Sequence, residues 1–498
     1  MNSATARRVK IVCTIGPATH SPEKLSGLMA EGMDVARLNF SHGDHDFYKK
    51  LIGNIRACAK KARKNVAILQ DLQGPKLRVG KLPQEGFVLN KGDTIYLYAE
   101  SPNEEAPAEI KSGKKTILPI SSEIAQAIVH DAKVGARILF DDGKIQGTIG
   151  KIGKSEIVVE IEYGGRITSH KGINLPGTPL SIPCVTAKDL QDLKFGLEQG
   201  VDAVALSFVR SASDIETVKE RIRRQSDDQP FVIAKIEREE AIDNMQSIIE
   251  ASDGLLIARG DMAVELGAPR VPIIQKTLIH QCNHMGVPVI TATQMLESMI
   301  FSPTPTRAEA SDVANAVFDG TDAVMLSGET ASGEYPLETV RTMSRIILEA
   351  ERAQNLYSGP RDILPIPGSV PESIEFSASR VAHHVDAVAI ACISRSGMAA
   401  RILAKFRPST PIVAIMDNEA GLRRLAMVWG VKGVLIKEIL ATDDLFAMVE
   451  KVLIEEGWAE PEDLVTVTAG VPTLKRGTTN MIKVHRISSQ WKKTKTSK

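Results

Sequence analysis

Short hydrophobic runs without polar alternation recur along the first and middle thirds of the chain. Runs rich in Val, Ile, Leu and Ala are typical of parallel strands that are covered on both faces. The eight runs are Val9–Ile15, Val35–Phe40, Val66–Leu69, Ala203–Phe208, Val232–Ile236, Leu255–Ala258, Val287–Ile290 and Ala323–Leu326. Helical patterns such as Pro22–Ala30 and Thr186–Gly200 follow them, and Thr186 and Asp189 are placed to cap the second helix. Eight strand–helix units in sequence favour a closed (β/α)8 TIM barrel of the α/β class over an open sheet.

One unit is interrupted after the third strand. The stretch from Leu77 to Asn174 contains short β segments separated by glycine turns. The predicted segments are Gly86–Leu89, Thr94–Tyr98, Arg137–Phe140 and Ile157–Ile161. We interpret this stretch as an inserted all-β, barrel-like module on the face where barrel active sites lie, and expect a mobile lid.

A third region follows a connection at Ser358–Pro371 and again alternates between strands and helices. The expected strands are Ala387–Ile393, Pro411–Met416, Gly433–Ile436, Leu464–Thr468 and Met481–Val484, with helices at Gly397–Phe406, Glu419–Trp429 and Asp443–Glu456. This order predicts an open α/β domain. The expected domains are residues 1–74 and 173–347 for the barrel, 75–172 for the lid and 348–498 for the C-terminal domain.

Composition narrows the class of function. The 498 residues include 61 Lys and Arg against 61 Asp and Glu, so the chain lacks the basic character of a nucleic-acid binder. No apolar run is long enough to cross a bilayer, and the basic N-terminus lacks the continuous apolar stretch of a signal peptide. Five scattered cysteines without a Cys-x-x-Cys pair predict free thiols in a reducing compartment. We expect a soluble cytoplasmic protein that binds neither nucleic acid nor membrane; its last residues, Trp491–Lys498, are expected to form a frayed basic tail.

Polar residues gather where the predicted barrel strands end, which is the first place to look for catalysis. Glu237 and Asp261 follow adjacent strands, and two carboxylates with substrate oxygens and waters form the usual Mg²⁺ arrangement. Lys235 lies two residues before Glu237 on the same face and could neutralise a transferring phosphoryl group or an enolate. The alternative is that Glu237, Asp261 and Lys235 form only a salt-bridge cluster at the rim.

A second polar group follows the second and third strands. Arg37, Asn39 and Ser41 alternate along one strand, and Asp71 and Arg78 follow the next. Cations mixed with neutral donors suggest phosphate binding, because arginine forks match phosphate oxygens. The alternative is a polar network that only holds the lid hinge.

Two other signals are assigned to packing or solvent. His280 and His284 are spaced as a helical metal pair, but they lie before the seventh strand and lack the Glu of a His-Glu-x-x-His motif. Met295, Met299 and Met325 are expected in the barrel core or an interface.

Seven motifs resemble those of the pyruvate kinase family and together span nearly the whole chain. They are Cys13–Pro17, Ala36–Gly43, Lys171–Gly177, Ala258–Asp261, Thr293–Met299, Pro305–Glu309 and Met325–Thr330. The resemblance implies a barrel A domain, a lid-like B domain and a C-terminal effector domain, usually in a homotetramer. It also implies phosphoryl transfer from phosphoenolpyruvate to ADP, giving pyruvate and ATP in the last step of glycolysis.

The resemblance also implies roles for individual residues. Glu237 and Asp261 would hold Mg²⁺, or Mn²⁺ in its place, and Lys235 would stabilise the transferring phosphoryl group and the enolate. Arg37 would bind the phosphate. The substrate carboxylate would lie against the backbone amides of Gly260 and Asp261 and against Thr293, which would help to protonate the enolate through water. The nucleotide phosphates would contact Arg78, Lys171 and the run Asn39, Phe40, Ser41 and His42.

Three segments depart from the family pattern. The chain reads Leu72-Gln73-Gly74-Pro75-Lys76-Leu77-Arg78-Val79 where Thr-Lys-Gly-Pro-Glu-Ile-Arg-Thr is common. Ser332 stands where many members have lysine, and Gly470–Gly477 lacks the Trp of some fructose-bisphosphate-regulated members.

The first departure resembles the K⁺-independent branch of the family. Members with Glu at the position of Lys76 hold a monovalent cation through oxygens that match Asn39, Ser41 and Asp71. The ammonium of Lys76 could supply a tethered charge in the same place. We therefore predict that K⁺ is not required. The alternative is that Lys76 faces solvent and K⁺ still binds Asn39, Ser41 and Asp71.

A phosphate-binding pattern also occurs in the C-terminal region. Ser394, Arg395, Ser396 and Gly397 follow a predicted strand and open a helix, where hydroxyls and backbone amides meet the positive helix end. The resemblance places the family's effector loop here, so we expect a phosphorylated sugar or AMP as activator. An ordinary helix cap is the alternative.

Two other classes of function stay open beside the kinase. A metal-dependent barrel lyase or aldolase would stabilise an enolate at the same site without a nucleotide. A metabolite sensor that does not catalyse would have lost catalytic residues, whereas every matched catalytic position here holds a competent residue.

Overall fold

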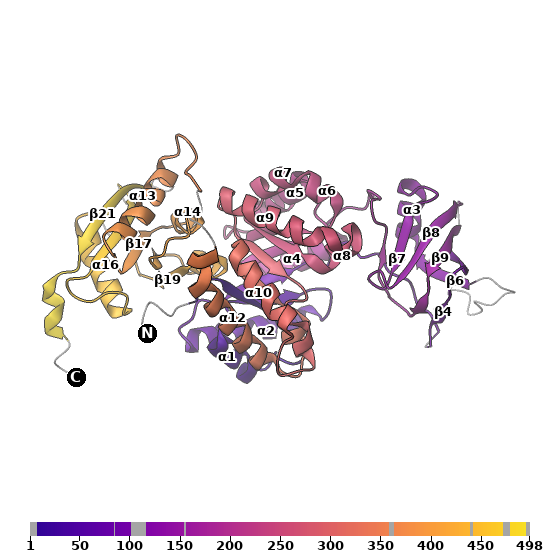
Figure 1. The fold of residues 1–498 in the computed structure, drawn as a ribbon, viewed down its shortest axis with the longest axis horizontal. Coiled ribbons are helices and arrows are strands. Elements are labelled where there is room, and N and C mark those ends of the chain that lie inside the picture. The colour runs from indigo at the N-terminus through magenta and orange to yellow at the C-terminus, as the bar shows by residue number, and fades with distance from the viewer. Residues whose placement is uncertain are drawn as a thin grey trace.

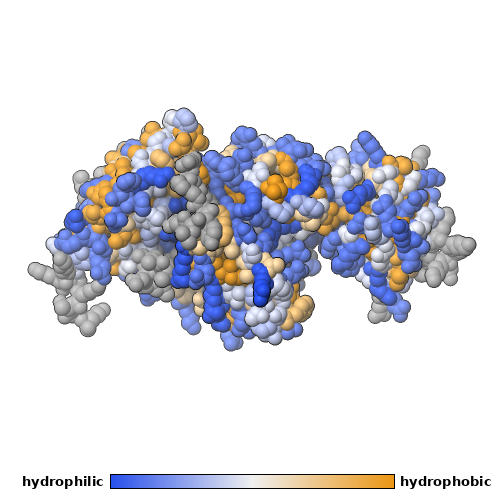
Figure 2. Space-filling view, viewed as in Figure 1, coloured by the Kyte–Doolittle hydropathy of each residue, from blue (hydrophilic) through white to orange (hydrophobic). Residues whose placement is uncertain are grey.

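The computed structural model describes residues 7–83, 85–100, 116–153, 156–357, 363–438, 442–471 and 479–494. Three bodies lie in a row, with the barrel in the middle, the inserted module at one end and the C-terminal domain at the other (Figure 1). Hydrophilic side chains dominate the visible surface of all three, with separate small hydrophobic patches (Figure 2). Within the described ranges, no helix combines the length and apolar character needed to cross a membrane. All five cysteines are buried free thiols, as predicted.

The central body is a closed parallel barrel with strand order β1-β16-β15-β14-β13-β12-β3-β2. Its strands are β1 Lys10–Thr14, β2 Val35–Asn39, β3 Ala67–Asp71, β12 Ala203–Leu206, β13 Phe231–Ile236, β14 Gly254–Ala258, β15 Val289–Ala292 and β16 Ala323–Leu326. Each overlaps one predicted strand, so the predicted barrel is confirmed. Side chains such as Val12, Leu69 and Leu256 fill the interior, which makes the barrel a packed core with its chemistry at the strand ends.

Helices surround the barrel. They are α1 Pro22–Glu31, α2 His45–Lys61, α4 Ala187–Glu198, α5 Ala212–Gln225, α6 Glu239–Asp243, α7 Met245–Ala251, α8 Arg259–Leu266, α9 Val271–Met285, α10 Arg307–Asp319, α11 Gly328–Ala331 and α12 Pro336–Tyr357, with 3-10 turns at Ala268–Arg270 and Glu297–Ile300. Thr186 and Asp189 form the predicted capping box at the start of α4. Each side chain bonds the backbone N–H of the other, which satisfies donors that the first turn leaves free.

The inserted module has two sheets, of order β11-β7-β8-β9-β5-β6 and β10-β4, and its own apolar core. Its strands are β4 Phe87–Leu89, β5 Thr94–Glu100, β6 Thr116–Ser121, β7 Arg137–Phe140, β8 Ile145–Ile152, β9 Glu156–Tyr163, β10 Gly165–Ile167 and β11 Ile173–Asn174. The four predicted β segments are confirmed, but the module is not purely β, because α3 Ser122–Asp131 lies between β6 and β7. Ser121 caps α3, and Ile124 and Ile128 bury one face of it. This short helical period is the signal that the sequence prediction missed.

The C-terminal domain is an open sheet of order β19-β18-β17-β20-β21, as predicted. Its elements are α13 Val370–His384, β17 Ala389–Ile393, α14 Met398–Lys405, β18 Ile412–Met416, α15 Glu419–Arg424, β19 Val431–Leu435, α16 Thr442–Glu455, β20 Leu464–Gly470 and β21 Thr479–Arg486, with 3-10 turns at Leu425–Met427 and Ser489–Thr494. The sequence prediction missed α13, although Ser369 caps it and Pro371 suits its first turn. Residues 358–362 of the predicted connection, 472–477 of the Gly470–Gly477 segment and 495–498 of the basic tail lie outside the described residues.

The C-terminal domain packs against the amino ends of the barrel strands. Asp322, directly before β16, pairs with Arg407 at 2.9 Å, and both side chains are at most 7% exposed. Lys10 at the start of β1 donates to the backbone oxygen of Val431 at 2.7 Å. This leaves the carboxyl ends of the strands to face the inserted module. The two ends of the barrel therefore have separate tasks.

Candidate active site

A lysine on β13 is the centre of the polar network at the barrel rim. The Nζ atom of Lys235 lies 3.3 Å from Oδ1 of Asp71 and 3.0 Å from Oε1 of Glu237. It also donates to the hydroxyl of Ser207 at 2.7 Å. Burial is the largest influence on the pKa of Lys235 and lowers it, but the two carboxylates together raise that pKa above its ordinary value. Lys235 is therefore a fixed positive charge.

Arg37 on β2 is held by the carboxylate of Asp71. Its Nη2 and Nε atoms lie 2.6 and 2.8 Å from Oδ2 of Asp71, and Nη1 donates to the Thr14 hydroxyl at 2.9 Å. Burial acts most strongly on the pKa of Asp71 and raises it, but the cations of Lys235 and Arg37 bring that pKa below its ordinary value. One buried carboxylate thus orients two cations, which confirms that Arg37 and Asp71 lie together.

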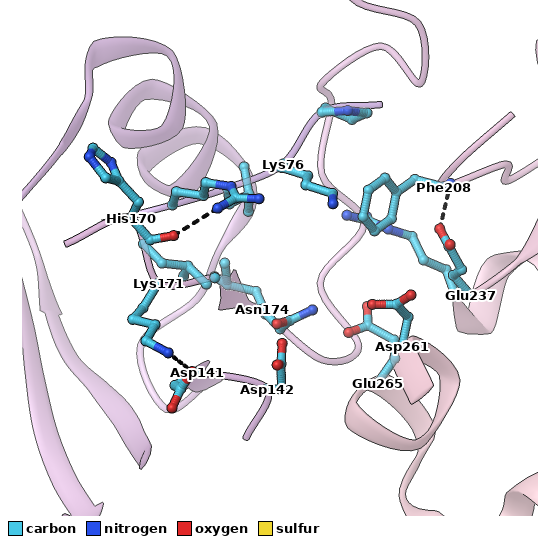
Figure 3. A pocket seen from close by; sticks show the side chains of 17 residues that line it. Lys76, Asp141, Asp142, His170, Lys171, Asn174, Phe208, Glu237, Asp261 and Glu265 are labelled. Atoms are coloured by element: carbon cyan, nitrogen blue, oxygen red, sulfur yellow. Dashed lines mark hydrogen bonds and ion pairs between the residues drawn. The ribbon is translucent and has the colours of Figure 1, made fainter. Parts of the chain in front are cut away.

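A cavity of about 320 Å³ separates the barrel rim from the inserted module. Glu237 and Asp261 line it from the barrel, and Asp142 and Lys171 line it from the module. Figure 3 shows the ammonium of Lys76 and the carboxylate of Asp261 pointing into this space. Anionic and cationic groups therefore face one shared cleft, large enough for small phosphorylated molecules.

Glu237 and Asp261 are the predicted metal pair. Glu237 is 2% exposed, and its Oε2 accepts from the backbone N–H of Phe208 at 2.7 Å. Burial most strongly, and then the charge of Asp261, raise the pKa of Glu237, while Lys235 lowers it. A bound cation would favour the ionised carboxylate.

The donor set fits Mg²⁺. In the described residues no three or more His, Cys, Asp or Glu side chains gather as a metal site. Two carboxylates at a cavity are nevertheless what Mg²⁺ requires, because that ion keeps several waters and takes further oxygens from phosphate.

The predicted carboxylate-binding residues meet at the start of α8. The backbone N–H of Gly260 donates to the Thr293 hydroxyl at 2.8 Å, and that hydroxyl donates to the backbone oxygen of Ala292 at 2.7 Å. Thr293 has a left-handed backbone, with φ of 68°. This turn brings Thr293 beside Gly260, the residue before Asp261, in agreement with the grouping that the family resemblance implied.

The predicted nucleotide-contacting residues divide between barrel and module. Arg78 donates to the backbone oxygen of His170 at 3.0 Å, and Lys171 pairs with Asp141 at 2.7 Å. Ser41 and His42 lie at the barrel surface, whereas Phe40 is 1% exposed and stacks on Tyr48 with ring centroids 4.0 Å apart. The Phe40 side chain is therefore part of the core, and only its backbone is available to a ligand.

The first segment that departs from the family pattern lines the same cavity. Lys76 is exposed toward it. Desolvation first, and then the nearby cations of Lys235 and Arg78, lower the pKa of Lys76, while Asp261 and Asp71 act in the opposite direction. The charged groups of the rim therefore influence the pKa of the Lys76 ammonium.

Several residues of the site were missed from the sequence, among them Ser207, Phe208 and Glu265 and, at the cavity, Asp141, Asp142, His170, Asn174 and Arg238. Ser207 and Phe208 directly follow β12, and Glu265 lies one turn after Asp261 on α8. Burial raises the pKa of Glu265 to about 7. Ser207 is a polar residue at the carboxyl end of the fourth barrel strand, and the same pattern identified the site residues after the other strands.

The predicted effector loop lies in the C-terminal domain, away from the cavity. The backbone N–H of Gly397 donates to the Ser394 hydroxyl at 3.0 Å, and Gly397 has φ of 81°. Met398 N–H donates to the Ser396 hydroxyl at 3.4 Å, at the start of α14. Arg395 lies 3.8 Å from Asp417. The loop therefore brings two hydroxyls and a cation to one helix end.

The two signals assigned to packing or solvent behave as predicted. Met295, Met299 and Met325 are at most 2% exposed. His280 and His284 are exposed on α9, with their Nε2 atoms 3.2 Å apart. Neither group approaches the cavity.

Comparison with known proteins identifies the family. A model of the pyruvate kinase barrel domain matches residues 6–340, and a model of the pyruvate kinase alpha/beta domain matches residues 372–485. The chain belongs to the pyruvate kinase family. A pyruvate kinase of Geobacillus stearothermophilus is 44% identical over 97% of this chain and 81% of its own length, and one of Staphylococcus haemolyticus is 42% identical over the same shares.

A solved structure supports the same assignment. The pyruvate kinase of Cryptosporidium parvum superposes with a TM-score of 0.87 and 35% identity, covering 98% of this chain and 97% of its own. The fold class and the kinase function are confirmed, and the kinase is preferred over the lyase and the sensor. This pyruvate kinase family member acts on phosphoenolpyruvate, with ADP as the second substrate.

Proposed function

We propose that the cavity between barrel and module is where this chain transfers a phosphoryl group from phosphoenolpyruvate to ADP, with Mg²⁺ on Glu237 and Asp261. The observation that carries the proposal is Lys235, whose ammonium lies within 3.3 Å of both Asp71 and Glu237, the second of which lines the cavity. Phosphoryl transfer requires positioning and charge neutralisation more than covalent chemistry. A permanently charged lysine beside two carboxylates meets that need.

The proposed roles follow from the contacts of each side chain. Lys235 neutralises the transferring phosphoryl group and then the enolate oxygen. Arg37, oriented by Asp71, binds the phosphate through the guanidinium N–H groups that do not bond Asp71 or Thr14. The substrate carboxylate lies against Gly260, Asp261 and Thr293, and the Thr293 hydroxyl passes a proton to the enolate carbon through water. When bound, Mg²⁺ or Mn²⁺ supplies Lewis-acid charge beside these groups.

The nucleotide is proposed to lie toward the module. Lys171 and Arg78 contribute cations from its two connections to the barrel, and Asn39, Phe40, Ser41 and His42 contribute backbone and polar groups from the barrel. Lys171 now pairs with Asp141, so ADP phosphates would exchange one anionic partner for another. We further propose that residues 75–172 move as a lid over barrel residues 1–74 and 173–347, and that residues 348–498 form the effector domain.

The metal assignment predicts the behaviour of two isosteric variants. Glu237→Gln and Asp261→Asn should each remove nearly all turnover by weakening Mg²⁺ binding, because each loses an anionic ligand. Asp261 is exposed, so Asp261→Asn should change the free energy of unfolding by no more than about 1 kcal/mol. Glu237 is buried beside Lys235, so Glu237→Gln should lower the free energy of unfolding by more than Asp261→Asn does. The measurement is pyruvate formation over a Mg²⁺ titration, with thermal unfolding in parallel. Unaltered activity of either variant at limiting Mg²⁺ would refute the assignment.

We propose that the enzyme works without K⁺. Support comes from Lys76, whose ammonium points into the cavity and whose pKa responds to Lys235, Asp71 and Asp261. Two of the three proposed cation ligands also have other partners, because Asn39 accepts from the backbone of Ser41 and Asp71 holds Arg37 and Lys235. A tethered ammonium offsets substrate charge in place of a free ion.

Rates in K⁺-free buffer with a bulky organic cation test this proposal. Adding K⁺ should raise the rate by less than about tenfold, which corresponds to 1.4 kcal/mol of transition-state stabilisation. Lys76→Glu should lower the K⁺-free rate and make it partly recoverable by K⁺. A rise above tenfold for the unmodified enzyme would contradict K⁺ independence.

We propose Ser394–Gly397 as the phosphate loop of an allosteric site for a phosphorylated sugar or AMP. Ser396→Asp should abolish activation, because its carboxylate would repel the effector phosphate at the start of α14. The measurement is phosphoenolpyruvate saturation with and without a panel of sugar phosphates and AMP. If the variant responds as the unmodified enzyme does, the loop is only a helix cap. The proposed assembly is a homotetramer, which sedimentation equilibrium measures as four times the monomer mass.

A further inference from the structure

The turn after β12 gives Phe208 an unusual backbone at the edge of the cavity. Phe208 has φ of 57°, in the left-handed region that residues with a bulky side chain rarely occupy. In the register of β12 with β13, where Leu206 lies beside Ala234, a continuing strand would bring Phe208 beside Ile236. The strand ends at Leu206 instead, and the N–H of Phe208 turns toward a side chain. We propose that Phe208 is a positioning residue that presents Glu237 and Lys235 to the metal and the phosphoryl group.

The hydrogen bonds of this turn reach both catalytic side chains. Phe208 N–H donates to Oε2 of Glu237 at 2.7 Å (Figure 3). The ammonium of Lys235 lies 3.0 Å from Oε1 of the same carboxylate. Both carboxylate oxygens are thus held, and their remaining lone pairs are left for a cation. The neighbouring Ser207 hydroxyl accepts from Lys235 at 2.7 Å and donates to the backbone oxygen of Leu72 at 2.8 Å. Two consecutive residues therefore orient the carboxylate and the ammonium.

Packing around the ring holds the turn in this conformation. The guanidinium of Arg238 lies 5.3 Å from the ring centroid, a cation–π contact on the cavity wall. The ring also lies close to Gly74, where an added Cβ would lie 3.0 Å from Cδ2 of Phe208 and 2.9 Å from Cβ of Ser207. A left-handed residue persists only where its surroundings over-determine it. The contacts of the ring with Arg238 and its close approach to Gly74 supply that constraint.

The inference rests on the proposed role of Glu237 as a Mg²⁺ ligand. The ring also borders a small space lined by Pro75, Leu77 and Leu180, so a purely packing role at the module hinge is the competing explanation. A packing role would change stability and leave the metal site of the folded protein unaltered. A positioning role would change metal binding itself. The two roles therefore separate in a metal titration.

The experiment measures Mn²⁺ binding by the EPR signal of the free ion, together with the Mg²⁺ dependence of kcat and thermal unfolding. Phe208→Ala should weaken Mn²⁺ binding at least tenfold and lower kcat, because a relaxed turn withdraws its N–H from Glu237. Phe208→Tyr keeps the ring and should restore both values to within threefold. Arg238→Met should weaken Mn²⁺ binding about threefold. Arg380→Met is the matched control, since Arg380 lies 5.3 Å from the ring of Phe376 on α13, and it should change nothing.

Several outcomes would overturn the inference. Unchanged Mn²⁺ binding in Phe208→Ala, with lower stability alone, would assign the ring to packing. Failure of Phe208→Tyr to recover metal binding, or an equal effect of Arg380→Met, would contradict it as well. If Glu237→Gln binds Mn²⁺ normally, the proposed metal site fails. If only Glu237→Gln loses Mn²⁺, the metal site stands and the role of Phe208 fails.

Discussion

The charge of one largely desolvated lysine, Lys235, whose side chain is 12% exposed, is the constraint on which the site depends. An ammonium removed from water is stable only beside negative charge, and Lys235 has Asp71 and Glu237 within 3.3 Å. Each partner has a second task, because Asp71 orients Arg37 and Glu237 faces the cavity. The charges of this network therefore stabilise one another. Neutralising Lys235, Asp71 or Glu237 leaves an opposite charge without its partner.

The barrel meets this constraint by dividing its two ends. The C-terminal domain covers the amino ends of the strands through contacts such as that of Arg407 with Asp322. None of the proposed catalytic side chains lies at that end of the barrel. The carboxyl ends carry Arg37, Lys235, Glu237 and Asp261, and the inserted module faces Glu237 and Asp261 across the cavity. Parallel strands make this possible because all their carboxyl ends lie at one rim. A change in charge at the rim therefore needs no change in the core.

Much of this arrangement was predictable from the sequence. Unbroken hydrophobic runs identified all eight barrel strands, because a strand buried on both faces is apolar along its length. Polar residues directly after those runs identified the rim, because the carboxyl ends of parallel strands lie together. Helix α3 and helix α13 were missed, since in the sequence each is marked only by a serine cap and a few apolar positions. Phe208 was missed for a different reason. Its role lies in a backbone angle and in a contact with Glu237, 29 positions away, which no local pattern records.

The most direct test of the account is the rate of pyruvate formation by Lys235→Met at saturating phosphoenolpyruvate, ADP and Mg²⁺. If Lys235 stabilises charge that develops during transfer, kcat should fall by about 10³-fold or more, while KM for phosphoenolpyruvate changes little. Lys219→Met is the control: Lys219 lies on α5, where its ammonium is 3.1 Å from Asp253, and its loss should leave both values unchanged. A raised KM with an unaltered kcat would show that Lys235 only binds the substrate. That result would contradict the account.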